Sequence, residues 1–195
     1  ADWHMPFLTT NGWLATPELA EDLFAAGLWG VSISIDYADA ERHDAQRGRP
    51  GAHARALAAI EAFSRARKHK WQRVNWMAVL VDDNLDQLEP MMRMAAERDA
   101  YFMVQPYGAR KTGSTKFRHR GDGTVAEYLL ELRARHPNFL SNPYFLARFD
   151  KALNTAPHGL IMFGPDGRVV VANREAAQLL NARDSSMLEG RTLHA

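Results

Sequence analysis

Cysteine is absent from the sequence of 195 residues. A chain without thiols forms no disulfide and no zinc–thiolate site, so neither kind of cross-link can stabilise its fold. The fold must depend on a hydrophobic core, for which 46% of the residues are hydrophobic. The lack of cysteine also fits the reducing cytosol, so a cytoplasmic location is predicted.

An excess of charge of either sign is also missing, because 24 Lys and Arg stand against 23 Asp and Glu. The net charge of +1 gives no electrostatic reason to predict a nucleic-acid or membrane partner. No apolar run approaches the roughly 20 residues of a membrane span, and the first residues lack the features of a signal peptide. The eight His residues are scattered, and neither a catalytic triad nor a phosphate-binding loop is present. No metal ligand and no catalytic residue is therefore predicted.

Strand and helix patterns alternate through the first half of the chain. The predicted strands run from Phe7 to Thr10, Val31 to Ile35, Val74 to Val81 and Ala100 to Gln105. The helices between them follow Thr16, include the segment from Leu57 to Phe63, and run from Asn84 to Arg98, with a polar loop from Tyr37 to Gly51. This order, with connections long enough for crossovers, predicts an α/β fold with parallel strands.

The predicted elements after the fourth strand include a change of pattern after Ala156-Pro157. A loop is predicted from Gly108 to Gly123, and helices are predicted from Thr124 to His136 and from Pro143 to Asn154. Two apolar runs, Gly159 to Phe163 and Arg168 to Val171, then flank a Gly-Pro-Asp-Gly turn, which predicts a hairpin followed by a helix from Asn173 to Leu180. We therefore expect two domains, residues 1–153 and 154–195.

Several short motifs of the first domain occur in a characteristic order. The sequence Thr-Asn-Gly at positions 10–12 is followed by Ser-Ile-Asp at 34–36, then by His43, Arg47-Gly48 and the segment from Gly51 to Ile60. This ordered set resembles the middle of the barrel of radical S-adenosylmethionine (SAM) enzymes. The resemblance implies a partial (β/α) barrel made of the later strands, and SAM and a 4Fe-4S cluster as the cofactors of the parent family.

The resemblance also implies a set of SAM-binding residues at the ends of strands. Thr10, with its neighbour Asn11, and Ser34 correspond to family positions near the methionine and ribose end of SAM, and Asp36 and Arg55 extend the set. Hydroxyls suit a zwitterion with a carboxylate, an amine and ribose hydroxyls, and a guanidinium can pair with the carboxylate. A structural role is the alternative for each: a turn for Thr10 and Asn11, a cap for Asp36, and a surface cation for Arg55.

The sequence departs from the family in one decisive respect. The family's three-cysteine motif and its Gly-rich methionine-binding segment have no counterpart here, and a chain without cysteine cannot hold a 4Fe-4S cluster. The resemblance begins just before the third barrel strand and covers roughly residues 5–150. It predicts a fragment that is inactive on its own, with the cluster of the parent enzyme bound by cysteines upstream.

Residues 154–195 resemble the start of a PAS sensor domain. The resemblance rests on four short motifs in order: Pro157-His158-Gly159-Leu160, Asp166-Gly167-Arg168-Val169, Ala172-Asn173 and Leu188-Glu189-Gly190-Arg191. A complete PAS domain is about twice as long, so no haem or flavin is assigned.

Two hypotheses for the whole chain follow. The first is a fragment of a radical SAM enzyme fused to a partial PAS domain, with a substrate that the sequence does not identify. The second is a non-enzymatic regulatory or protein-interaction module built from a degenerate barrel and a PAS segment. A half-barrel has unpaired strand edges, so self-association is predicted under either hypothesis. A third possibility is that the fusion and the ends of the chain result from a gene-boundary or assembly artefact.

Overall fold

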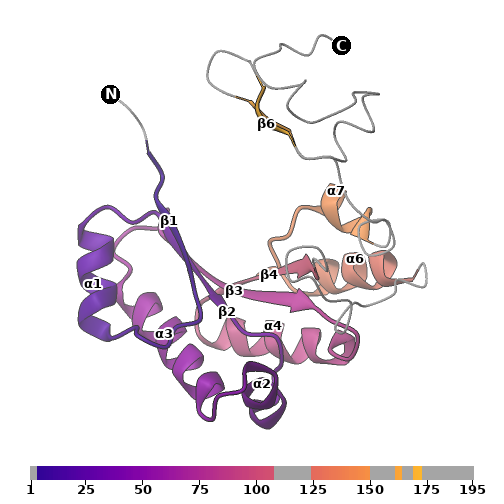
Figure 1. Cartoon of the computed structure of the whole chain (residues 1–195), viewed down its shortest axis with the longest axis horizontal. Helices are drawn as coiled ribbons and strands as arrows, with labels where there is room; N and C mark the ends of the chain where they lie inside the picture. The colour runs from indigo at the N-terminus through magenta and orange to yellow at the C-terminus, as the bar shows by residue number, and fades with distance from the viewer. Residues whose placement is uncertain (1–3, 108–123, 150–160, 164–168, 173–195) are drawn as a thin grey trace. The chain divides into compact units, whose positions relative to one another are not determined.

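The computed structural model describes residues 4–107, 124–149, 161–163 and 169–172, and it divides into two compact units, residues 1–153 and 154–195 (Figure 1). The division falls at the residue expected from the sequence, and the assignment of the two units to a partial barrel and a PAS-like segment stays a prediction. The loop predicted from Gly108 to Gly123 and the helix predicted from Asn173 to Leu180 lie outside the described residues.

A parallel sheet of four strands forms the centre of the larger unit. Its strands lie side by side in sequence order: β1 (Phe7–Thr10), β2 (Gly30–Ser34), β3 (Arg73–Leu80) and β4 (Tyr101–Pro106). The predicted strands and their parallel pairing are confirmed, with bounds that differ by at most one residue. Because the strands are parallel, their carboxyl ends meet at one edge of the sheet, where ligands of such folds bind.

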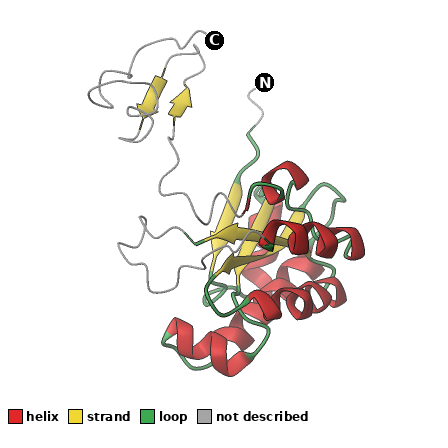
Figure 2. Cartoon of the chain, turned by 90° about the vertical axis from the view of Figure 1, so that its right-hand side faces the viewer, coloured by secondary structure: helices red, strands yellow, loops and turns green. Residues whose placement is uncertain are grey.

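Helices of the larger unit lie on one side of this sheet (Figure 2). They are α1 (Pro17–Ala25), α3 (Ala52–Ala66), α4 (Leu88–Glu97), which follows a 3-10 turn (Leu85–Gln87), and α6 (Val125–Arg135). The start of α1 is as predicted, because the hydroxyl of Thr16 accepts a hydrogen bond from the Leu19 amide (3.1 Å) and Pro17 occupies the first position.

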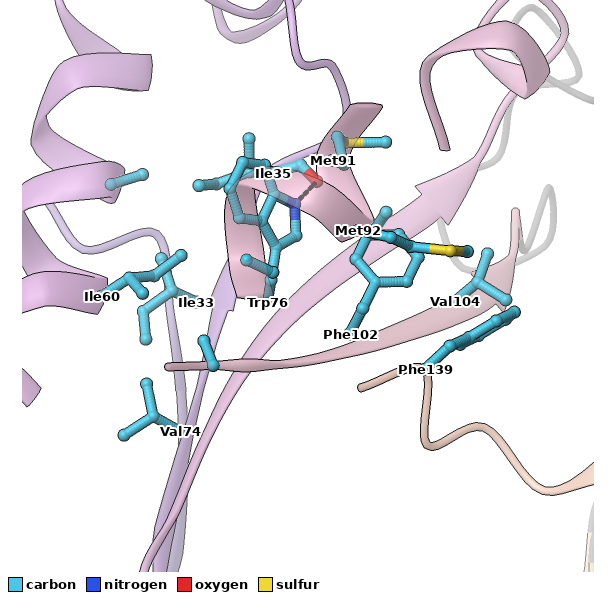
Figure 3. Packing of buried hydrophobic residues seen from close by; sticks show 14 of the residues in the cluster. Ile33, Ile35, Ile60, Val74, Trp76, Met91, Met92, Phe102, Val104 and Phe139 are labelled. Carbon is cyan, nitrogen blue, oxygen red and sulfur yellow. Dashed lines mark hydrogen bonds between the residues drawn. The ribbon is translucent and has the colours of Figure 1, made fainter. Parts of the chain in front are cut away.

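The core lies between the sheet and these helices (Figure 3). Ile33 of β2, Trp76 of β3 and Phe102 of β4 are fully buried and lie opposite one another in the register of their strands, so they project toward the same face. The indole of Trp76 donates a hydrogen bond to the Ile35 carbonyl (3.0 Å), which satisfies its polar atom inside the core. The opposite face of β2 and β3 therefore carries the other alternate residues, among them Ser34.

The predicted loop from Tyr37 to Gly51 is wrong in its middle, where the chain forms helix α2 (Ala40–Arg47). Asp39 caps its start by accepting a hydrogen bond from the Arg42 amide (2.8 Å), and Gly48, at φ 62°, ends it in the left-handed conformation. The only buried residue of α2 is His43. The helix was missed because it has no apolar stripe, although its caps are visible in the sequence.

Two further differences concern the segment after α6. Helix α7 (Pro143–Leu146) begins at the predicted residue, with Asn142 as its cap, and a turn follows it at residues 147–148; residues 150–154 of the predicted helix lie outside the described residues. Before it, the chain runs beside β4: the Phe102 amide donates to the Asn138 carbonyl (2.8 Å), and the Leu140 amide donates to the Phe102 carbonyl (2.9 Å). No strand was predicted there. Part of the outer edge of β4 is therefore paired, and self-association through strand edges stays a prediction.

The smaller unit is described only at its hairpin. Strand β5 (Ile161–Phe163) pairs antiparallel with β6 (Val169–Ala172), which confirms the predicted hairpin. Within the described residues of both units, none of the helices has the length and apolar character needed to cross a membrane.

Candidate functional site

Thr10 and Asn11 shape the turn that leaves β1. The Thr10 hydroxyl accepts a hydrogen bond from the Gly12 amide (3.1 Å), and the Asn11 side-chain oxygen accepts one from the Trp13 amide (3.0 Å). Gly12 has φ 76° and lies so close to α3 that a Cβ atom there would be 2.8 Å from the Cβ of Ala59. The Thr-Asn-Gly motif therefore fixes the end of β1 against α3, which is the structural role named above for these residues.

Ser34 is the last residue of β2 and is half-buried. No hydrogen bond of its hydroxyl occurs among the described residues, whereas Ser32 on the same face accepts one from the Asn75 amide group (3.3 Å). The register pairs Thr10 with Ile33, and side chains alternate along a strand. The Thr10 and Ser34 side chains therefore start on opposite faces of the sheet, and only Ser34 has an unused hydroxyl.

Asp36 follows Ser34 and is 2% exposed. One carboxylate oxygen accepts a hydrogen bond from the Val79 amide (2.9 Å), and the other pairs with the Arg47 guanidinium (2.6 Å). A charge-assisted pair of this kind is among the stronger hydrogen bonds. Asp36 thus joins the end of β2 to β3 and α2, and its contact with SAM stays a prediction.

Asn84 is a structural residue of this edge that was not among the predicted site residues. It is fully buried, its side-chain oxygen accepts from the Val81 amide (2.9 Å), and its amide group donates to the carbonyls of Asp36 (2.7 Å) and Val79 (2.9 Å). The one signal in the sequence is an Asn between a strand and a helix, where such side chains bond the backbone of turns. Asn84 holds the ends of β2 and β3 together.

His43 and Asp44 connect α2 to the same edge. The ring nitrogen Nδ1 of the buried His43 accepts a hydrogen bond from the Asp36 amide (3.3 Å), which requires the neutral imidazole. Asp44 accepts hydrogen bonds from the Gly51 amide (2.5 Å) and the His53 amide (2.8 Å) at the start of α3, and these bonds hold the pKa of Asp44 below its usual value. Helix α2 therefore connects the end of β2 to the start of α3.

This arrangement predicts a stability that falls with acidification. Burial, followed by the charges of Arg47 and His53, lowers the pKa of His43 to about 4, while Asp44 acts in the opposite direction. In the unfolded chain an imidazole titrates near 6.5, so between about pH 6.5 and 4 the unfolded state binds more protons than the folded state. We expect the free energy of unfolding to fall as the pH decreases through this window, by on the order of 1 kcal/mol per pH unit.

Urea denaturation at several pH values between 7.5 and 4 tests this expectation. The variant His43→Gln, which does not titrate, should show a shallower pH dependence than the wild type. The slope should not vanish, because burial lowers the pKa of His53 as well. Equal slopes for the variant and the wild type would contradict the role given to His43.

Arg55 lies near the start of α3 and is exposed. Its guanidinium carbon is 5.6 Å from the ring centroid of Trp13, and that of Arg49 is 3.4 Å from the same centroid. Among the described residues neither arginine pairs with a carboxylate. Because Gly12 packs on Ala56 and Ala59 of α3, the start of this helix lies at the carboxyl end of β1. Arg55 is therefore an exposed cation without a carboxylate partner at the carboxyl edge of the sheet, and its helix packs on the face opposite to that of the Ser34 side chain.

The donors at this edge fit SAM but not an iron–sulfur cluster. Ser34 supplies an unused hydroxyl and Arg55 an unpaired guanidinium, which suit the polar groups and the carboxylate of a methionine moiety. The chain has no cysteine, and the described residues contain no group of three or more His, Asp or Glu that could hold a metal ion. The chain therefore lacks the cysteine thiolates that hold a 4Fe-4S cluster.

A separate hollow of about 700 Å³ lies beside the start of α6. Its lining includes the carboxylates of Asp82, Asp83, Asp86, Glu127 and Glu131, and none of the five predicted site residues. So many carboxylates would repel the carboxylate of SAM. The hollow is therefore unsuited to the predicted ligand.

Comparisons with known proteins bear on this site. No family model matches the chain. It is 56% identical over 59 residues to an AdoMet-dependent heme synthase of Methanosarcina barkeri, which covers 30% of this chain and 17% of the relative. It is 39% identical over 93 residues to a GTP 3',8-cyclase of Pseudomonas putida, and 37% identical over 96 residues to the mycofactocin maturase MftC of Mycolicibacterium smegmatis. The chain is similar to radical SAM enzymes.

The similarity is partial. The match to the cyclase covers 47% of this chain and 26% of that protein, and the match to the maturase covers 49% and 24%. The chain thus spans about a quarter or less of these radical SAM relatives. A solved structure, that of SuiB from Streptococcus suis, shares the fold at a TM-score of 0.51 with 20% identity, over 73% of this chain and 30% of that one. The parallel four-stranded sheet is thus consistent with part of a radical SAM (β/α) fold.

Proposed function

We propose that the larger unit is the part of a radical SAM enzyme that binds the methionine end of SAM. The observation that carries the proposal is that Ser34 and Arg55, two residues expected from the family motif, have no polar partner among the described residues. The similarity to an AdoMet-dependent heme synthase supports the choice of ligand.

The five predicted residues divide into two roles in this proposal. Ser34 donates or accepts a hydrogen bond with the methionine moiety, and Arg55 pairs with its carboxylate. Thr10, Asn11 and Asp36 act indirectly, because their bonds within the chain hold the ends of β1 and β2 in place. In radical SAM enzymes, SAM and the 4Fe-4S cluster together supply a 5'-deoxyadenosyl radical. This chain has no ligands for the cluster, so we propose that it binds SAM and does not cleave it alone.

Calorimetric titration of SAM into the full chain tests the proposal. We expect weak binding, reduced about five-fold in Ser34→Ala by the loss of one hydrogen bond, and about ten-fold in Arg55→Ala by the loss of a charge-assisted one. Arg65→Ala is the matched control, because Arg65 lies at the other end of α3 and is 81% exposed. It should leave the affinity unchanged. A wild-type chain that does not bind SAM would contradict the proposal.

For residues 154–195 we propose the opening segment of a PAS-like domain. The antiparallel pair of β5 and β6 is compatible with such a hairpin, and the motifs given above supply the resemblance. Extending the chain at its carboxyl end by the residues that complete a PAS domain should raise the cooperativity of unfolding of this unit. No change in the unfolding of the hairpin on extension would contradict the assignment.

A further inference from the structure

Trp13 brings two arginines together at the edge of the sheet. The guanidinium carbons of Arg49 and Arg55 lie 3.4 Å and 5.6 Å from its ring centroid, and both distances are within the range of a cation–π contact. The two arginines come from different segments, one from the connection before α3 and the other from α3 itself. The half-buried indole contacts both side chains.

The position of Trp13 is fixed by the turn that precedes it. The Asn11 side chain accepts a hydrogen bond from the Trp13 amide (3.0 Å), and the Ala15 amide donates to the Gly12 carbonyl (3.1 Å). The tight contact of Gly12 with Ala59 fixes the same turn against α3. Trp13 is therefore held beside the start of α3, where Arg55 lies.

The charges around Trp13 are unbalanced. The two arginines of α2 pair with carboxylates: Arg42 with Asp83 and Asp86, and Arg47 with Asp36. Arg49 and Arg55 do not pair with a carboxylate among the described residues, and both are exposed. Two like charges on one ring repel each other, so an anionic group between them would be stabilised. A carboxylate suits two guanidiniums, because each oxygen can accept from a different donor.

We infer that Trp13 is a positioning residue that holds Arg49 beside Arg55, so that the carboxylate of the ligand meets two guanidiniums. The inference rests on the proposed binding of SAM and adds two residues to it. Trp13 does not touch the ligand and acts through the arginines. Arg49 becomes a second ligand-binding cation.

Titration with two ligands tests the inference on the full chain. SAM carries the carboxylate, whereas decarboxylated SAM keeps the sulfonium and the nucleoside but lacks it. We expect Trp13→Leu and Arg49→Gln each to weaken the binding of SAM about three-fold and to leave the binding of decarboxylated SAM unchanged. Trp13→Phe should keep most of the affinity, since phenylalanine preserves a π face. Arg65→Gln, remote on α3, is the control and should change neither affinity.

The outcomes separate the inference from the proposed function. If the wild type binds SAM and Trp13→Leu weakens the binding of SAM and of decarboxylated SAM equally, the effect is structural and the inference is overturned. If Arg49→Gln binds SAM as the wild type does, Arg49 is not part of the subsite, which also overturns it. A wild type that binds neither ligand contradicts the proposed function and the ligand assigned here.

A measurement without ligand decides the positioning role directly. In the free chain, NMR should show the side-chain protons of Arg49 and Arg55 shifted upfield by the indole ring, and Trp13→Leu should abolish both shifts. Unshifted Arg55 protons in the wild type would overturn the inference even where SAM binds.

Discussion

Replacing Gly12 with alanine is expected to lower the free energy of unfolding by about 3 kcal/mol. Gly12 has φ 76°, a conformation that costs an L-residue roughly 1–2 kcal/mol. The new Cβ would also lie 2.8 Å from the Cβ of Ala59 and 3.1 Å from the Cα of Ala56, and overpacking of this kind costs about 1–3 kcal/mol. Ala56 Cα belongs to the backbone of α3, so the helix or the turn must move. Urea denaturation of the two proteins measures the difference.

Gly27→Ala is the matched control for this prediction. Gly27 has φ 97°, yet a Cβ there would meet no atom within 4 Å. Only the conformational cost remains, so we expect a loss of about 1 kcal/mol. If the two variants lose the same stability, the close approach of the turn to α3 makes no contribution. SAM binding should also weaken in Gly12→Ala, because the displaced turn carries Trp13 away from Arg55.

Much of the central fold could be predicted because alternating apolar residues indicate a strand with one buried face. The run from Val31 to Ile35 alternates branched apolar residues with serines, and in the structure Ile33 and Ile35 are buried in the core. Helix α2 has no apolar pattern in its sequence, since its one buried residue is His43. The sequence likewise has no pattern that indicates the pairing beside β4, because Phe102 and Asn138 pair there through their backbones. Patterning shows which side chains are buried and says little about the hydrogen bonds of the backbone.

The sequence predicts that the five candidate residues come together at one edge of the sheet, and their binding of SAM stays a prediction. The five predicted site residues lie at the carboxyl ends of β1 and β2 or near the start of α3, since parallel strands bring these points together. The sequence does not say which side chains are already bonded within the chain. Asp36 illustrates this, because its partners Arg47 and Val79 come from α2 and β3 and are set by the tertiary packing. Ser34 occupies a similar place, but none of the described residues bonds its hydroxyl.

Asn84→Ala is expected to destabilise the protein by about 3 kcal/mol, because a single buried side chain satisfies three backbone groups. The variant leaves the Val81 amide and the carbonyls of Asp36 and Val79 without this partner, in an environment closed to water. Each unsatisfied buried group costs about 1–3 kcal/mol, and local relaxation recovers part of the total. Urea denaturation measures the loss, and the hydrogen exchange of the Val81 amide should become faster in the variant.

The comparison with Asn142→Ala shows whether the loss of stability in Asn84→Ala comes from the burial of the side chain or from the loss of hydrogen bonds alone. Asn142 is exposed and accepts one hydrogen bond, from the Tyr144 amide (2.8 Å), as the cap of α7. Its loss should cost about 1 kcal/mol. A large loss of stability at Asn84 together with a small one at Asn142 would mean that the strand ends depend on this buried amide.

Because Asn84 bonds the carbonyl of Asp36, two residues beyond Ser34, its removal should also weaken SAM binding. If stability and SAM binding both persist in Asn84→Ala, the edge of the sheet is held by the bonds of Asp36 and not by Asn84.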